Sequence, residues 1–220
     1  MGGHAPIPEL LRLQQQYGLF LYIDDAHGVS LFGEQGQGFA RSQFGSDLGD
    51  RTIIAASLGK GFGASGGVLM LGTAEQEALF RRYALPHAFS AAANLAAVGA
   101  ALGSCRIHRS AELGQRQRRL AQRIGLFDRR IPTAESGNSL PIRMITVGSE
   151  AAAIAMAREF LDAGFYTSVT FFPTVAQGKA GIRVCLTADH DVEDVERLCA
   201  CILAKSPSEL RQPETMAASA

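Results

Sequence analysis

The stretch Ser57-Leu-Gly-Lys60-Gly-Phe-Gly-Ala-Ser-Gly-Gly67 indicates how this 220-residue chain folds. Short apolar runs precede it at residues 52–56 and follow it at residues 68–71, and both have the length of buried strands. The stretch is therefore expected to be a glycine-rich turn between two strands. Glycine on both sides of Lys60 lets the backbone turn tightly and approach a ligand closely. A partly buried lysine can serve as a nucleophile or form a Schiff base, whereas an exposed turn lysine is the simpler alternative.

Three known motifs match parts of this turn, but each requires a different context. A P-loop needs glycine five residues before its Gly-Lys pair, where this chain has Ile54. Gly61-Phe-Gly-Ala-Ser-Gly66 fits the dinucleotide fingerprint and Gly63-Ala-Ser-Gly-Gly67 fits a nucleophile elbow, yet both motifs must lead into a helix. A strand is expected here instead. A hydrolase triad completed by Asp189 and His190 is disfavoured, because adjacent residues rarely fill both roles.

A second polar segment follows another predicted strand. The short apolar run at residues 19–23 comes after a helix expected over residues 9–17 and leads into Asp24-Asp-Ala-His27-Gly. Helix followed by buried strand favours a parallel sheet, and ligands bind at the carboxyl ends of such strands. Asp24 and His27 are therefore placed to reach a ligand. In the alternative interpretation, Asp24 caps a turn and His27 is a satisfied polar residue.

The rest of the chain divides into helical and mixed parts. A helix is expected over residues 74–83, and one or two helices over 91–124 with a possible break between 104 and 109. After Pro132 the pattern predicts a small α+β unit with a strand at 140–147, a helix at 150–163, strands at 166–171 and 182–187, and a helix at 192–204. We expect a sheet domain over residues 1–125, the small domain over 126–204 and a disordered tail over 205–220.

The composition excludes several classes of protein. Lys and Arg together number 21 and so do Asp and Glu, which argues against a nucleic-acid binder or a basic membrane-surface protein. No apolar run reaches the roughly 18–20 residues that a membrane span needs, and the first residues do not open a signal peptide. Four cysteines are too few for a disulfide scaffold, and Cys199-Ala-Cys201 lacks the spacing of a zinc pair. We therefore expect a cytoplasmic protein with reduced thiols and no metal site.

Taken together, the Asp24 and Lys60 segments resemble the α-oxoamine synthases, a family of fold-type-I enzymes that depend on pyridoxal 5'-phosphate. Residues 1–7, Met-Gly-Gly-His-Ala-Pro-Ile, resemble the family stretch S-M-x-G-x-x-A-P-L. Residues 178–190 resemble its late segment G-x-x-R-[IL]-R-x-x-x-[ST]-A-x-H. The four segments occur in the family's order, and the resemblance extends to about residue 204. It implies an α/β fold that comprises part of the large, mostly parallel sheet domain and the small α+β C-terminal domain.

The resemblance also implies a role for residues near the cofactor. Lys60 would form the Schiff base and later move the proton on the substrate's Cα, and Asp24 would pair with the pyridinium nitrogen. His27 would hydrogen-bond the phenolic oxygen of the ring. Ser57 stands where the family has Thr or Ser near the cofactor phosphate. Ser90 falls where the family reaches the phosphate of the partner subunit, which implies a homodimer with a shared active site.

The implied substrates are an amino acid and an acyl thioester, carried on coenzyme A or on a carrier protein. Arg183 would bind the carboxylate of the amino acid, a task that suits the guanidinium fork. The reaction is a decarboxylative condensation that releases an α-amino ketone. Relative to the family pattern, the sequence begins partway through, and roughly the first half of such an enzyme is absent. Two alternatives stay open: a fold-type-I aminotransferase, which exchanges an amino group with an oxo acid, and an inactive remnant that acts as a dimerisation module.

Overall fold

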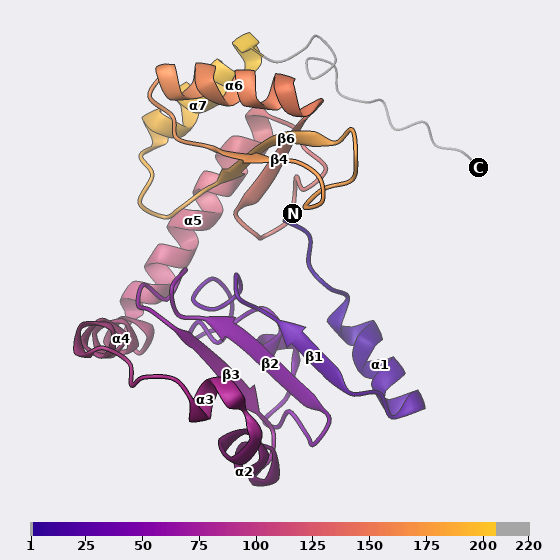
Figure 1. The fold of residues 1–220 in the computed structure, drawn as a ribbon. Helices are drawn as coiled ribbons and strands as arrows, with labels where there is room; N and C mark the ends of the chain where they lie inside the picture. Colours follow the sequence, from indigo (N-terminus) through magenta and orange to yellow (C-terminus); the bar gives the residue numbers. More distant parts are fainter. Residues whose placement is uncertain (1, 206–220) are drawn as a thin grey trace. The chain divides into compact units, whose positions relative to one another are not determined.

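The computed structural model describes residues 2–205, which form two compact units (Figure 1). One unit is Ala5–Gln117, and the other combines residues 2–4 with residues 118–205. Each unit contains one three-stranded sheet. Within the described residues, no helix has both the length and the apolar character that crossing a membrane requires. Lys205 ends a helix, and the rest of the expected tail lies outside the described residues.

The sheet of the first unit has the strand order β1–β2–β3. Its strands are β1 (Leu21–Asp24), β2 (Thr52–Ser57) and β3 (Gly67–Leu71). Strand β1 runs parallel to β2 with Asp24 opposite Ala55, and β3 runs antiparallel to β2. The predicted strands and the parallel pair are confirmed. The glycine-rich turn connects β2 to β3.

Helix α1 (Ile7–Tyr17) packs on one face of this sheet. It has a proline in its first turn and ends at Gly18, whose φ of 65° is the left-handed conformation that glycine adopts without strain. The fully buried Ile7 and Ile54 lie in one apolar cluster that joins the helix to the sheet. Side chains alternate along a strand, so Ala55 and Ser57 of β2 point to the face opposite Ile54.

The remaining helices of the unit are the 3-10 turn η1 (Arg41–Gln43), α2 (Ala74–Tyr83), α3 (Leu85–Ala88) and α4 (Leu95–His108). Thr73 and Gln76 form a capping box at the start of α2, which occupies the predicted range. The region expected to hold one or two helices holds two, because α4 ends at His108 and the next helix begins at Ala111. Helix α4 has an apolar sequence but no buried residue.

The second unit has the predicted strand–helix–strand–strand–helix order. Its elements are β4 (Ile142–Gly148), α6 (Glu150–Asp162), β5 (Ser168–Thr170), β6 (Ala180–Cys185) and α7 (Val192–Lys205). The sheet order is β4–β6–β5, and both pairings are antiparallel. Helices α6 and α7 lie on one face of the sheet (Figure 1). A single apolar core, with Phe127, Phe160 and Ile182 fully buried, joins the helices to that face.

The two units divide between Gln117 and Arg118, earlier in the chain than the boundary expected after residue 125. The reason is that helix α5 (Ala111–Arg130) is continuous across both positions. Ile124 and Phe127, in its second half, belong to the core of the second unit. An amphipathic helix carries no composition change at the point where its packing partner changes, so the sequence gives no signal for this division.

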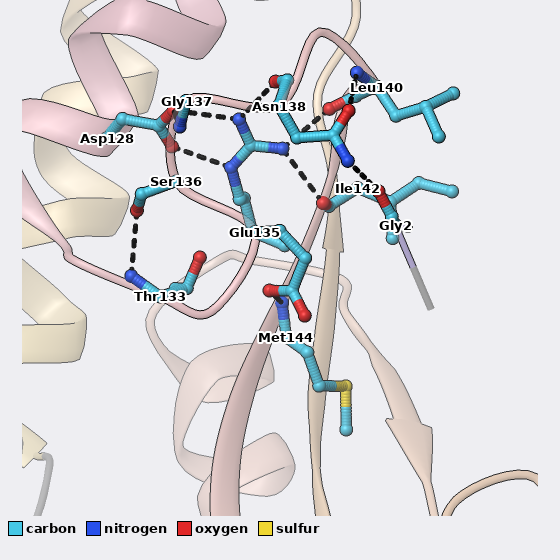
Figure 2. A network of polar contacts seen from close by, with 11 residues as sticks. Gly2, Asp128, Thr133, Glu135, Ser136, Gly137, Asn138, Leu140, Ile142 and Met144 are labelled. Carbon is cyan, nitrogen blue, oxygen red and sulfur yellow. Dashed lines mark hydrogen bonds and ion pairs between the residues drawn. The ribbon is translucent and has the colours of Figure 1, made fainter. Parts of the chain in front are cut away.

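A buried arginine forms hydrogen bonds with the chain between α5 and β4. Arg143 has no exposed side-chain surface, and its Nε and Nη2 donate to the two carboxylate oxygens of Asp128 at 2.6 and 2.8 Å. The same guanidinium donates to the carbonyls of Asn138, Leu140 and Ile142. In Figure 2, the Asn138 side chain reaches Gly2, whose carbonyl accepts from its Nδ2 at 2.7 Å. Residues 2–4 are thereby attached to the second unit.

Candidate active site

Three of the predicted site residues lie at one edge of the sheet in the first unit. Asp24 ends β1, Ser57 ends β2, and Lys60 follows Ser57 in the turn. Because β1 and β2 are parallel, their carboxyl ends meet at the same edge. Asp24 is in register with Ala55, and Ser57 is two residues further along β2, so Asp24 and Ser57 point to the same face. The structure thus brings a carboxylate, a hydroxyl and the turn that carries Lys60 to one edge of the sheet.

The turn that carries Lys60 is held by its own backbone. The Leu58 amide donates to the Gly66 carbonyl at 2.9 Å, and the Ala64 amide donates to the Leu58 carbonyl at 2.8 Å. The Gly59 amide donates to Ser57 Oγ at 3.2 Å. Lys60 itself is exposed, and no described residue forms a hydrogen bond or ion pair with its ammonium group. The turn leads into β3 and not into a helix, which confirms that it is neither a dinucleotide fingerprint nor a nucleophile elbow.

The two adjacent aspartates at the end of β1 lie in different environments. Asp24 is exposed, and its Oδ1 accepts from the Ala26 amide at 2.9 Å in a local turn. Asp25 is buried, and its Oδ2 accepts from the Ala40 amide at 2.9 Å. Burial raises the pKa of the Asp25 carboxyl, the Ala40 bond opposes that shift, and the nearby Asp24 charge adds to it. A Cβ on Gly28 would collide with this carboxylate. Asp24 is therefore the residue available to a ligand, and Asp25 shapes the loop.

The loops that carry Asp24 and Lys60 touch each other. A Cβ on Gly61 would lie 2.8 Å from Leu31 Cδ1 and 2.9 Å from the Val29 carbonyl oxygen. Real Cβ atoms do not approach so closely, so only glycine fits at residue 61. This contact sets the spacing between the two loops, and no motif in either segment predicts it.

His27 and Ser90 were also predicted as site residues. His27 is exposed in the turn after β1, three residues beyond Asp24. Ser90 is exposed in the irregular segment after α3. Within the part of the chain that the structure describes, no hydrogen bond connects Ser90 to the residues at the carboxyl edge of the sheet, and its role stays a prediction.

Arg183 lies in the second unit, at the centre of β6. Met144 of β4 and Ser168 of β5 flank it in register, so all three point to one face of the sheet. Its Nε is buried and has no hydrogen-bond partner among residues 2–205, and the same is true of Oγ1 of Thr167, the residue before Ser168. Buried polar groups are nearly always paired, so two orphaned groups in one region indicate a place for a polar ligand.

Both orphaned groups line one cavity of about 440 Å³. Its walls come from the segments 164–168 and 183–186 and from residues of the α7 region, namely His190, Asp194, Val195, Arg197 and Leu198. Arg183 is the residue that the sequence singled out here, whereas Thr167 carried no motif and was missed.

Comparison with known proteins agrees with these features. The family model for aminotransferase class I and II matches residues 2–202. The chain is 33% identical over 201 residues to an 8-amino-7-oxononanoate synthase of Marinomonas sp. (strain MWYL1), covering 90% of this chain and 49% of that protein. It is 34% identical over 204 residues to the 8-amino-7-oxononanoate synthase of Geobacter sulfurreducens, covering 91% and 51%. The chain thus spans about half the length of these relatives.

Solved structures show the same fold. A serine palmitoyltransferase from S. paucimobilis superposes with a TM-score of 0.80 at 20% identity, covering 92% of this chain and 51% of that one. The 8-amino-7-oxononanoate synthase from Francisella tularensis gives a TM-score of 0.71 at 22% identity, covering 90% and 58%. The predicted α/β fold and the resemblance to α-oxoamine synthases are confirmed. With nearly its whole described length matched by the family model, the chain belongs to the aminotransferase class I and II family.

Proposed function

We propose that this chain supplies the lysine-bearing half of a pyridoxal-phosphate-dependent acyltransferase. The enzyme would condense an amino acid with an acyl thioester, on coenzyme A or an acyl carrier protein, with loss of carbon dioxide, and release an α-amino ketone. The observation that carries the proposal is the meeting of Asp24, Ser57 and Lys60 at one sheet edge. In this view Ala5–Gln117 is part of the cofactor-binding domain, and the second unit is the small C-terminal domain.

The donors at this edge suit the cofactor. Pyridoxal phosphate presents an aldehyde, a ring nitrogen and a phosphate, and when bound it serves as an electron sink for the substrate's Cα electrons. Lys60 has an amine that no described residue engages, and flanking glycines leave space around it. Asp24 keeps an exposed carboxylate, which would hold a proton on the ring nitrogen by charge pairing. Ser57 offers a half-buried hydroxyl for the phosphate.

The remaining roles follow from the same placement. His27 would donate to the phenolic oxygen of the ring, since it follows Asp24 by three residues at the same sheet edge. Lys60 Nζ would attach the cofactor covalently and would then take and return the proton at the substrate's Cα. Ser90 would bind phosphate from a second subunit.

Arg183 would bind the carboxylate of the amino acid. Its unpaired, buried Nε needs an acceptor, and a carboxylate satisfies a guanidinium through two parallel hydrogen bonds. The Thr167 hydroxyl, which lines the same cavity, is a second donor without a partner.

We propose a homodimer in the cytoplasm. The apolar helix α4 supports the dimer, because it has no buried residue in the single chain and Leu95 is 89% exposed. The cytoplasmic location is supported by the four cysteines, all of which are free in the described residues, as expected in a reducing compartment.

Titration with pyridoxal phosphate, followed by borohydride reduction and peptide mapping, tests the proposal. The expected result is a reduced adduct on Lys60 that is absent from a Lys60→Arg variant, while the exposed Lys179 serves as an internal control. The measurement is then repeated with the other half of the family fold supplied. Labelling only at Lys179 or Lys205 in both experiments would contradict the proposal. Release of carbon dioxide and free thiol distinguishes this reaction from an aminotransferase, which would exchange an amino group with an oxo acid.

A further inference from the structure

A polar bridge outside the predicted motifs connects the two loops of the candidate site. The loop after β1 carries Asp24 and His27 and continues to Ser30, and the turn after β2 carries Lys60 and continues to Phe62. Gly61 packs directly against Val29 and Ser30, so a shift in either loop changes the spacing of the site. What holds the loops in this arrangement is a set of side chains on helices α4 and α5.

Ser30 is held in an unfavourable backbone conformation. It is buried, and its φ of 75° is the only positive φ among the described residues other than glycine. Such a conformation costs free energy and persists only where the surroundings impose it. Here every polar group of Ser30 is engaged: its amide donates to the Gly36 carbonyl at 2.8 Å, its carbonyl accepts from Gln117 Nε2 at 3.1 Å, and its Oγ lies 2.8 Å from His108 Nε2.

His108 occupies the centre of the bridge. Its Nδ1 lies 2.8 Å from the Ser104 carbonyl oxygen, which can only accept, so Nδ1 donates there, and Nε2 forms the hydrogen bond with Ser30 Oγ. Ser104 Oγ in turn donates to the Phe62 carbonyl at 2.5 Å. The rings of His108 and Phe62 also pack, with centroids 4.8 Å apart. One turn of α4 therefore forms hydrogen bonds to Ser30 in one loop and to Phe62 in the other.

We propose that His108 and Ser104 are positioning residues of the cofactor site. They do not touch the cofactor; they fix the distance between the Lys60 turn and the loop that carries Asp24 and His27. The inference rests on the proposed function for its consequence, while the bridge itself can be tested without the cofactor.

Amide hydrogen exchange of this chain tests the bridge. His108→Phe keeps the ring beside Phe62 but removes both hydrogen bonds, and exchange over residues 26–36 and 57–66 is expected to accelerate about tenfold, equivalent to about 1.4 kcal/mol. His108→Gln can restore a bond to Ser30 and is expected to recover part of the protection. The matched control is His87→Phe on the exposed side of α3. Exchange over residues 180–186 should stay unchanged in all variants. Unchanged exchange in both loops of His108→Phe would overturn the proposal.

Smaller changes guard against a variant that does not fold. Ser104→Ala removes the bond to Phe62 and the 3.3 Å contact of the same hydroxyl with His108 Nδ1, whereas Ser30→Ala removes only the bond to His108. Each is expected to accelerate exchange in both loops, because the loops also contact each other at Gly61. Acceleration confined to the loop that loses its own hydrogen bond would show that the bridge does not couple the two loops and would overturn the proposal.

The positioning role is read from the labelling of Lys60. The rate of borohydride-fixed modification by pyridoxal phosphate should fall about tenfold at Lys60 in His108→Phe, with Lys179 unchanged in the same sample. Faster loop exchange with an unchanged Lys60 rate would overturn the positioning role and leave the proposed function intact. If Lys60 of the unmodified protein takes no label even with the other half of the fold supplied, the proposed function fails, and the exchange measurement alone decides the bridge.

Discussion

Replacing Arg143 with methionine should destabilise the second unit far more than the same replacement of an exposed arginine. Methionine keeps most of the apolar stem but loses all donors. The variant therefore leaves Asp128, whose side chain is only 14% exposed, without its ion-pair partner and with only the Gly137 amide as a hydrogen-bond donor. It also removes the guanidinium donors from three carbonyls, those of Asn138, Leu140 and Ile142. The substitution tests whether the network in Figure 2 holds the chain between α5 and β4.

The expected loss follows from these contacts. Removing one partner of a buried ion pair costs about 3–5 kcal/mol, because the remaining charge is uncompensated. Water can reach the partly exposed Asp128, which favours the lower end of that range, whereas each buried carbonyl left without a donor adds to the cost. We expect a loss of about 4 kcal/mol. Domains of this size are stable by about 5–15 kcal/mol, so the loss should be a large fraction of the unit's free energy of unfolding.

Pulsed thiol labelling in urea measures this loss within the correct unit. Cys199 is buried in the core of the second unit and becomes reactive when that unit opens. Its labelling midpoint should move to much lower urea in Arg143→Met. Arg197→Met is the control, because Arg197 forms an exposed ion pair with Asp194 that is worth about 0–1 kcal/mol.

Two results would refute this reasoning. A loss below about 1 kcal/mol, equal to that of the control, would mean that the guanidinium bonds contribute nothing net. The double variant Asp128→Leu/Arg143→Met should recover part of the stability, since it no longer buries an unpaired carboxylate. If the double variant is as unstable as the single one, the cost does not come from the orphaned charge.

Three further outcomes are expected. Burial raises the pKa of the Cys199 thiol to about 11, so at pH 8 a disulfide reagent should modify it more than about a hundredfold slower than the exposed Cys185; similar rates would contradict its burial. The pKa of Asp25 is raised in the folded state, so the native protein binds a proton more readily than the unfolded chain, and its stability should fall as pH rises above 3.8 toward the raised value. In urea titrations, Asp25→Asn should remove that component of the pH dependence, and an unchanged pH profile would contradict the raised pKa. In the reconstituted enzyme, Arg183→Lys should raise the KM for the amino acid at least about tenfold and leave labelling of Lys60 unchanged. Loss of both activity and Lys60 labelling would instead show that Arg183 is needed for folding.

Much of the secondary structure could be predicted because its signals are local. The helix expected over residues 74–83 is α2, and its start has the Thr73–Gln76 capping box. Helix α1 ends at Gly18, and the strands on either side of the Lys60 turn lie where short apolar runs are bounded by glycine or aspartate. In each case the residues that determine the element lie within a few positions of it.

The features that escaped prediction depend on contacts between distant residues. His108 and Ser30 are 78 positions apart, and nothing in either segment indicates that they meet. Glycine at residue 61 could be interpreted as a flexible turn residue, but it is required because a Cβ there would collide with the Val29 carbonyl oxygen. The division of the units inside α5 escaped for the same reason, since one amphipathic helix can pack against two different partners along its length.

The pair Asp24-Asp25 shows how far a local rule can carry a functional prediction. Two adjacent aspartates are chemically equal as candidates for a cofactor nitrogen, but adjacent residues of an extended chain point to opposite sides. Leu21 is buried and Tyr22 is exposed, so the exposed side of β1 holds Tyr22 and Asp24. Asp25, by parity with Leu21, turns inward to the Ala40 amide. Alternation along the strand therefore leaves Asp24, and not Asp25, on the exposed side, which supports the role proposed for Asp24, whereas the distance from Asp24 to Lys60 depends on packing that no local rule contains.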